Sequence, residues 1–403
     1  MEKEKIVVAS FQSLNKHTAA GIAKLGYLLS AKLDERNALD SFIISSKGKF
    51  RTPFRSKPVS SWSRYYLFVL NSISKRIGLP AHISRYVQEL LYDRFCSNHL
   101  HSSVTKLIVT TPYLFRTFKK ARRLGIPIYF IPGNPEDNFI ATLVKEENAR
   151  YNITGDDPYT YYRRLNYYNK SVPLIDKIVT YSSVMESSYS NAGFQDKIIS
   201  MRGYLKPELS EEPIRRSKGK FKVAFLAYTV LLKGLQYVLE AWKELDGYDM
   251  ELHIGGIIDR NVQHLIDTEY SHLKNVFYHG LITDVPKFFS DKSLYVLSSI
   301  IDGAPVSVLE AMNSRLPVII SENCGTKDII EEGKSGWIVP NRNAEAIRER
   351  ILEAYEHQEK TEQMGAYAHH VLAAYDKEPF IRDLAALAIG EDCKQMVNER
   401  EIL

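Results

Sequence analysis

The chain has 403 residues, of which 44% are hydrophobic and 25% are charged, and its formal net charge is +5. This length supports two or three domains with cores of their own, and ordinary numbers of Gly and Pro exclude collagen-like and low-complexity chains. The three cysteines are far apart and form no CxxC pair, which argues against a disulfide framework and a structural zinc site.

The first apolar run, at residues 6–9, directly follows a charged N-terminus. It is too short for the core of a signal peptide. No stretch approaches the roughly 18 consecutive apolar residues that a membrane span needs. We therefore expect a cytoplasmic protein.

Short β-branched runs alternate with segments of helical period along the chain. In the first half, the predicted strands are 5–9, 41–44, 107–110, 127–131, 177–181 and 197–200. In the second half, they are 222–226, 251–254, 276–278, 294–297, 317–320 and 336–339. Nearly continuous apolar strands separated by helices predict parallel sheets covered on both faces, an α/β doubly wound architecture.

The strand–helix pattern restarts near residue 220, after a polar segment punctuated by Pro207 and Pro213. We predict a Rossmann-like N-terminal domain at 1–203, a linker at 204–217 and a Rossmann-like C-terminal domain at 218–380. The segment 381–403 is expected to pack back on the N-terminal domain. Because ligands bind beyond the carboxyl ends of parallel strands, both domains should line a cleft between them.

The interval 41–88 contains no acidic residue, and its Lys and Arg residues are interleaved with Phe, Trp and Tyr. Basic heads attract anionic lipid headgroups, and aromatic rings suit a membrane interface. We expect this excursion to contact an anionic acceptor or the inner face of the plasma membrane, through residues 47–85. A plain solvated surface is the alternative. Nucleic acid is disfavoured because no nucleic-acid motif accompanies the charge.

The segment 298–312 follows a predicted strand and opens a helix. Gly303 permits a tight turn, and Pro305 suits the first turn of a helix. The main-chain N–H groups of Ala304, Val306 and Ser307 would then be free to bind an anion such as a diphosphate. Two carboxylates bracket this turn, Asp302 before it and Glu310 on the helix. The pattern suits a nucleotide sugar.

This segment resembles the E-x7-E region of the retaining family 4 glycosyltransferases, which have the GT-B fold. The similarity continues through Pro317-Val318-Ile319-Ile320-Ser321, Gly325, Asp328-Ile329-Ile330, Gly333 and Gly336. The resemblance implies that Glu310 holds the ribose and Asp302 the transferred sugar, in a donor site that needs no metal and no cofactor.

Earlier motifs of the C-terminal half extend the likeness. The segment 225–234 occupies the place of the family's "G-R-L…K-G" loop, which implies that Lys233 contacts the donor diphosphate. Tyr228 stands where the family has an Arg that binds phosphate, and Asp302 stands where it has a Glu. Leu281 begins the loop that would meet the nucleotide base.

The likeness is weaker in the N-terminal half. His17 and Gly21 lie where the family has a glycine-rich loop, and we expect them on the acceptor side of the cleft. Asn134 and Glu136 follow the strand 127–131 and are further candidates to face the acceptor, with a plain loop as the alternative. Asp156-Asp157 is interpreted as a solvated turn rather than a metal site.

These observations predict a retaining, metal-independent glycosyltransferase. It would move a sugar from a nucleotide-diphosphate-sugar to a hydroxyl of a lipid-linked or surface glycan, in polysaccharide or lipopolysaccharide synthesis. Two alternatives share the architecture: a GT-B sugar epimerase or phosphorylase, and a non-catalytic nucleotide-sugar-binding subunit. A non-catalytic subunit would fit the presence of Tyr228 where the family has an Arg.

Overall fold

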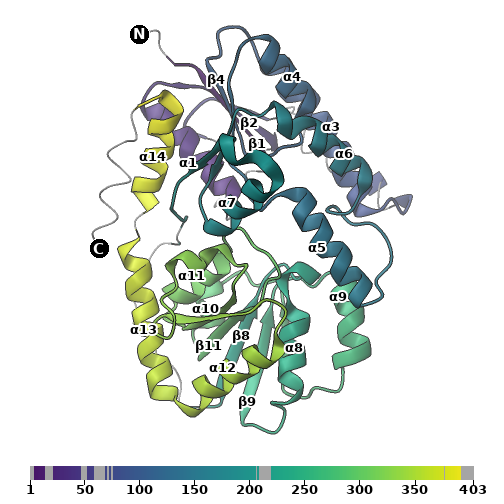
Figure 1. The fold of residues 1–403 in the computed structure, drawn as a ribbon, viewed down its shortest axis with the longest axis vertical. Coiled ribbons are helices and arrows are strands. Elements are labelled where there is room, and N and C mark those ends of the chain that lie inside the picture. The colour runs from purple at the N-terminus through teal and green to yellow at the C-terminus, as the bar shows by residue number, and fades with distance from the viewer. Residues whose placement is uncertain are drawn as a thin grey trace.

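A computed structural model describes residues 4–13, 21–46, 52–58, 69, 72–73, 76–205, 207, 219–375 and 377–391. The chain forms two stacked α/β lobes (Figure 1). His17 lies outside the described residues, as do the parts of the predicted excursion at 47–51, 59–68, 70–71 and 74–75. None of the helices in the described ranges combines the length and hydropathy that a membrane span requires.

The N-terminal lobe is built on a parallel seven-stranded sheet in the order β3-β2-β1-β4-β5-β6-β7. Its strands are β1 Ile6–Ser13, β2 Leu39–Ser46, β3 Ser56–Pro58, β4 Lys106–Val109, β5 Ile128–Phe130, β6 Lys177–Thr180 and β7 Ile198–Ser200. The order places β1 beside both β2 and β4, which is the point where the direction of winding changes.

The C-terminal lobe repeats this plan with a parallel six-stranded sheet in the order β10-β9-β8-β11-β12-β13. Its strands are β8 Phe221–Leu226, β9 Met250–Gly255, β10 Val276–Gly280, β11 Leu294–Leu297, β12 Val318–Ser321 and β13 Gly336–Val339. Here β8 lies between β9 and β11, so a switch point again opens at the carboxyl ends of central strands.

Helices connect the strands and cover the sheets. In the first lobe they are α1 Ile22–Glu35, α3 Ala81–His99, α4 Phe115–Arg123, α5 Asp137–Arg150, α6 Tyr162–Ser171 and α7 Ser183–Tyr189. In the second lobe they are α8 Leu235–Lys243, α9 Arg260–Leu265, α10 Val285–Phe289, α11 Val306–Asn313, α12 Ala344–Glu356 and α13 Gln358–Ala374. A last helix, α14 Lys377–Ile389, follows α13.

Strand alternation divides the core of the N-terminal lobe into two layers. Ile6 and Val8 pack with α1 and α14, whereas Val7 and Ala9 pack with α3, α4 and α6 on the other face. The C-terminal lobe has one large cluster, which extends to side chains of α5 in the first lobe. The apolar runs of the inner strands are therefore buried on both faces, as the doubly wound prediction requires, whereas the edge strands β7 and β10 are partly exposed.

The structure differs from the sequence prediction at one edge of the first sheet. β3 lies inside the interval 41–88 and pairs with β2, so part of that interval belongs to the sheet. The three residues of β3 are too few to show the alternation of apolar and polar side chains that predicts a strand. Pro58, opposite Ile44, also opposes a strand prediction, yet proline is accepted in an edge strand because no ladder partner needs its missing N–H.

The chain crosses between the lobes twice. The first crossing begins at Tyr204, which is buried and whose hydroxyl donates to Gly325 O at 2.8 Å. The second crossing lies between α13 and α14 (Figure 1). Helix α14 packs against α1 of the first lobe. The predicted boundary at 380 falls inside α14, because the helical period runs unbroken through Phe380.

Candidate functional site

The loop that contains Lys233 is fixed against the segment that follows β11. A short 3-10 helix, Leu231–Lys233, ends at Gly234, whose φ of 73° favours glycine. A Cβ at this position would lie 1.9 Å from Ser298 O. Ser298 Oγ donates to Gly234 O at 2.7 Å, and Ile300 N donates to Leu232 O at 2.8 Å. The Lys233 loop and the segment that follows β11 are distant in sequence, but these hydrogen bonds hold them together.

Lys233 Nζ forms an ion pair with the carboxylate of Asp302. Burial alone would lower the pKa of Lys233, but the carboxylate outweighs this effect and raises that pKa. The main chain of Asp302 is held on both sides, since its N–H donates to Asn323 O at 3.0 Å and its carbonyl accepts from Gly325 N at 2.9 Å. The site thus holds a charged ammonium in a fixed place.

Gly303 lies where the two lobes meet. A Cβ there would be 2.2 Å from Met185 Cε of α7 and 3.4 Å from Gly133 O. The Gly303 carbonyl accepts from Ser182 Oγ at 2.7 Å and lies so close to Gly325 that a Cβ at Gly325 would overlap it. Close approach of backbone from both lobes explains why glycine is needed at this turn.

Helix α11 begins at Val306, and Pro305 is its N-cap. Within the described residues, the N–H groups of Ala304, Val306 and Ser307 meet no main-chain acceptor. Such N–H groups at a helix N-terminus, together with the helix dipole, provide an anion site. The Ser307 hydroxyl accepts from Tyr295 OH at 2.8 Å, which orients it.

Glu310 is half-buried on α11, and its carboxylate makes no hydrogen bond or ion pair within the described part of the chain. Burial raises its pKa to about 7, and Lys24 on α1 opposes this rise. A carboxylate in such a place is suited to accept hydrogen bonds from ligand hydroxyls. The approach of Lys24 from the other lobe was not predicted, because nothing in the sequence links the two positions.

Tyr228 and Leu281 lie beyond the carboxyl ends of β8 and β10, with 61% and 67% of their surfaces exposed. Gly256, beyond the intervening strand, has a φ of 106°, and a Cβ there would lie 1.8 Å from Ala227 O. The three loops are therefore neighbours at one edge of the sheet. Tyr228 and Leu281 remain candidates for donor contacts.

On the N-terminal side, Gly21 has a φ of 66° and lies directly before α1. It lines, together with Ala304 and Val306, a cavity of about 30 Å³ between the lobes. That volume holds about one water molecule. Asn134 is exposed after β5.

Glu136, which was predicted to face the acceptor, has a structural role in the unliganded protein. It is the N-cap of α5, where Oε2 accepts from Phe139 N at 2.8 Å and Oε1 accepts from Asn138 Nδ2 at 2.8 Å. The side chain is 2% exposed. The sequence analysis missed this cap because Glu is not among the residues that N-caps favour, which are Ser, Thr, Asp and Asn.

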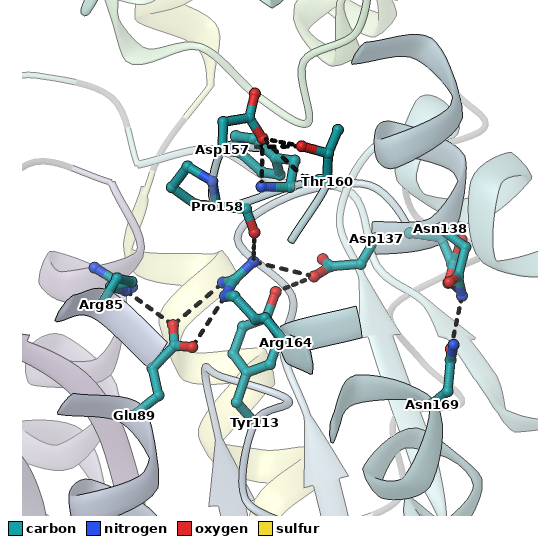
Figure 2. A network of polar contacts seen from close by, with 12 residues as sticks. Arg85, Glu89, Tyr113, Asp137, Asn138, Asp157, Pro158, Thr160, Arg164 and Asn169 are labelled. Carbon is teal, nitrogen blue, oxygen red and sulfur yellow. Dashed lines mark hydrogen bonds and ion pairs between the residues drawn. The ribbon is translucent and has the colours of Figure 1, made fainter. Parts of the chain in front are cut away.

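A buried polar network on the N-terminal side was not predicted (Figure 2). Arg164 donates to both oxygens of Glu89, at 2.9 and 3.2 Å, and to Pro158 O at 2.8 Å. It also lies 3.6 Å from Asp137 Oδ2 and above the ring of Tyr113. Burial raises the pKa of Asp137 to about 6, which Arg164 opposes. The network ties α3, α5 and α6 to the turn at 157–160.

Asp157 accepts hydrogen bonds from Tyr159 N at 2.7 Å and Thr160 N at 2.9 Å (Figure 2). This is an Asx-type turn, so the carboxylate at 157 is used within the chain. Among the described residues, no group of three or more His, Cys, Asp or Glu side chains is arranged to hold a metal ion.

Two further contacts join the lobes beside the site. Asp328 accepts from Ser183 N at 2.7 Å and from the Ser183 hydroxyl, and so caps α7 from the opposite lobe. At the other end of the junction, Arg342 pairs with Glu146 and Glu147 of α5, at 2.8 and 2.7 Å. The orientation of the lobes is therefore fixed by charged and capping contacts as well as by apolar packing.

Comparison with known proteins gives this site a family context. Residues 208–371 match the family model of the glycosyl transferases group 1. Over 133 residues the chain is 31% identical to the putative colanic acid biosynthesis glycosyltransferase WcaL of Salmonella typhimurium, a match covering 30% of this chain and 32% of that protein. The poly(ribitol-phosphate) alpha-N-acetylglucosaminyltransferase of Staphylococcus aureus is 29% identical over 110 residues, 27% of this chain and 22% of that protein.

Solved structures extend the likeness to the whole fold. The crystal structure of HepE from Anabaena in complex with UDP-glucose superposes with a TM-score of 0.62 and 12% identity, covering 96% of this chain and 99% of that one. The matches to the two curated relatives span a third or less of those proteins, whereas the structural match is almost complete. The protein thus has two Rossmann-like domains in the GT-B arrangement, and residues 208–371 of its C-terminal half are similar to the group 1 glycosyltransferases.

Proposed function

We propose that the protein is a retaining, metal-independent glycosyltransferase that transfers a sugar from a nucleotide-diphosphate-sugar to a hydroxyl of a glycan. The observation that carries this proposal is the constellation at one edge of the C-terminal sheet. It consists of Lys233, the N–H groups at the start of α11 and Glu310, whose carboxylate has no partner among the described residues. The group 1 family model covers the same residues.

The proposed reaction breaks the bond between the anomeric carbon and the diphosphate oxygen and forms a bond from that carbon to the acceptor oxygen. The acceptor proton passes to the leaving diphosphate. Negative charge develops on that diphosphate, so the main catalytic demand is electrostatic. Lys233 and the N-terminus of α11 would supply the stabilising charge. A charge-assisted hydrogen bond of this kind contributes about 1.5–3 kcal/mol.

Glu310 would accept hydrogen bonds from the ribose hydroxyls, and Asp302 would contact the transferred sugar. Retention of configuration follows from the family resemblance. UDP-sugars are the first donors to test, since the structure of Anabaena HepE was determined with UDP-glucose. The relative in Salmonella typhimurium is named for colanic acid biosynthesis, which supports a glycan acceptor.

The test is a thermal-shift screen of UDP-, GDP- and ADP-sugars, followed by a transfer assay with the ligand that binds. A donor at a hundred times its Kd should stabilise the protein by about 2.7 kcal/mol. Lys233→Ala and Glu310→Ala should both lose most of this stabilisation and of transfer. Lys243→Ala is the matched control, since this partly exposed lysine of α8 pairs with Glu240 at 2.9 Å and belongs to none of the predicted site residues. Full activity in both site variants would contradict the assignment.

A further inference from the structure

A groove of about 380 Å³ lies between α5 and α7, on the surface of the N-terminal lobe. This volume falls within the range of small-molecule pockets, roughly 300–1,000 Å³. Its lining comes from the first turns of α5 and from α7 with the single π-helical turn Ser190–Phe194 that continues it. The lining side chains used below are Glu136, Asn138, Phe139, Thr142, Ser188 and Asn191.

The groove combines one exposed aromatic ring with amide and hydroxyl groups. Phe139 is 42% exposed, although a phenyl ring gains by burial. Thr142 Oγ1 donates to Asn138 O at 2.9 Å, and its lone pairs stay free to accept. The Asn191 side chain makes no hydrogen bond within the described residues. Such a surface offers both an apolar platform and hydrogen-bonding groups.

Asn138 is held in place by neighbours on both sides. Its Nδ2 donates to Glu136 Oε1 at 2.8 Å and to Asn169 Oδ1 of α6 at 2.9 Å. Figure 2 shows this pair of amides bridging the two helices. Both hydrogens of Asn138 Nδ2 are thus used, while its Oδ1 can accept a hydrogen bond from a ligand. A fixed amide loses little side-chain entropy when a ligand binds.

The inner wall of the groove continues to the junction of the lobes. Glu136 N donates to Ser188 Oγ at 3.1 Å, which joins the start of α5 to α7. One helical turn before Ser188, Met185 packs against the position of a Cβ on Gly303. One turn of helix is about 5.4 Å. The groove therefore lies about one turn of α7 from the residue that faces Gly303, and its lining includes none of the predicted donor-site residues.

The charge of the groove favours neutral ligands over ionic ones. Among its lining residues, Glu136 alone carries a formal charge, and both carboxylate oxygens already accept from N–H donors of α5. No lining residue is a Lys or Arg that would pair with phosphate. An uncharged, hydroxyl-rich ligand with apolar ring faces fits this combination of groups best.

We infer that this groove binds a neutral oligosaccharide segment of the acceptor, beyond the sugar unit that carries the reacting hydroxyl. The inference rests on the proposed glycosyltransferase function and adds to it a second acceptor subsite. Phe139 lies under the apolar face of a sugar ring, and Asn138, Thr142 and Asn191 bond its hydroxyls.

The experiment measures binding of maltopentaose, cellopentaose and chitopentaose to the full chain by saturation-transfer difference NMR. At least one of them should bind. Phe139→Ala removes the ring, and Thr142→Arg fills the groove from an exposed position of α5. Each should weaken binding of that oligosaccharide at least tenfold. Ala149→Arg adds the same side chain at an exposed position of α5 outside the groove, and should leave binding unchanged.

Stabilisation by UDP is measured on the same samples. It tests the donor site separately, and it should be equal in the wild type, Phe139→Ala and Thr142→Arg. Absence of UDP binding in the wild type would sink the donor assignment, whatever the glycans do. The groove inference is overturned if no pentasaccharide binds the wild type, or if Thr142→Arg and Ala149→Arg bind it equally well.

Discussion

Lys233 and Asp302 are 69 positions apart in the chain, yet their side chains form an ion pair at the junction of two loops. The ammonium that is expected to hold the donor diphosphate is therefore paired with a carboxylate of the protein itself. An incoming diphosphate must compete with Asp302 for Lys233, or share it. The two residues should then respond differently to substitution.

Asp302→Asn should separate donor binding from transfer. Without the carboxylate, Lys233 loses its competitor, so UDP should stabilise this variant at least as much as the wild type. Sugar transfer should fall tenfold or more, because the group expected to contact the transferred sugar has lost its charge. Thermal shift with UDP and an assay of transfer measure the two quantities. Loss of UDP binding in Asp302→Asn would show that the carboxylate supports the diphosphate site.

Glu310 should make both stability and donor binding depend on pH. Its pKa is about 7 in the folded protein and 4.5 in an ordinary glutamate, so between these values the folded state binds more protons than the unfolded state. The stabilisation from the protonated form is complete below about 4.5 and is lost as pH rises through 7. Glu310→Gln should therefore melt higher than the wild type at pH 8, and the difference should vanish near pH 4.5.

Donor binding should show the opposite trend. Ribose hydroxyls donate to an ionised carboxylate more strongly than to a protonated one, so UDP affinity should increase as pH rises through 7. In Glu310→Gln this rise should disappear. Isothermal titration with UDP at pH 6, 7 and 8 measures both proteins. An equal pH dependence in the variant would assign the titration to another group.

Gly234→Ala should disturb the site through the main chain alone. The φ of 73° costs a non-glycine residue about 1–2 kcal/mol, and the added Cβ would also overlap Ser298 O. The variant should melt below the wild type and lose transfer, since Lys233 is the preceding residue. Gly247→Ala is the matched control, because a Cβ there meets no atom within 4 Å. It should melt at or slightly above the wild type.

Sequence periodicity was enough to predict the strands that have long apolar runs. Each of the twelve predicted runs overlaps a strand of the two parallel sheets. The inner strands are buried on both faces, which leaves little freedom in their residue types. β3 escaped prediction because it is short, lies at an edge and contains Pro58. Its formation depends on the neighbouring strand β2 rather than on its own residues.

The sequence predicted those parts of the candidate site that depend on local residues, but not those that depend on tertiary contacts. Gly303 and the start of α11 are local features, since a turn and a helix N-terminus are encoded within a few residues. The approach of Lys24 to Glu310 and the pairing of Lys233 with Asp302 depend on how loops and lobes meet. Glu136 shows the converse: its residue type suggested a ligand contact, whereas its local context is that of a helix cap.

At the contact between the lobes, two adjacent carboxylates pair with the same arginine. Glu147 of α5 is fully buried, pairs with Arg342 at 2.7 Å and accepts from Tyr237 OH at 3.0 Å. Glu146 pairs with the same Arg342 at 2.8 Å, but its side chain is 51% exposed. Burial, rather than the number of ion pairs, should decide what each one contributes.

Glu147→Ala should lower the free energy of unfolding by about 1–3 kcal/mol, because it leaves the buried Tyr237 hydroxyl without its acceptor, whereas Arg342 keeps Glu146 as a counter-charge. Glu146→Ala, the matched control, should lower it by no more than about 1 kcal/mol, since water replaces the lost carboxylate. Urea unfolding followed by tryptophan fluorescence measures both values. Equal effects of the two substitutions would mean that Arg342, Tyr237 and the lobe contact can rearrange around the missing carboxylate.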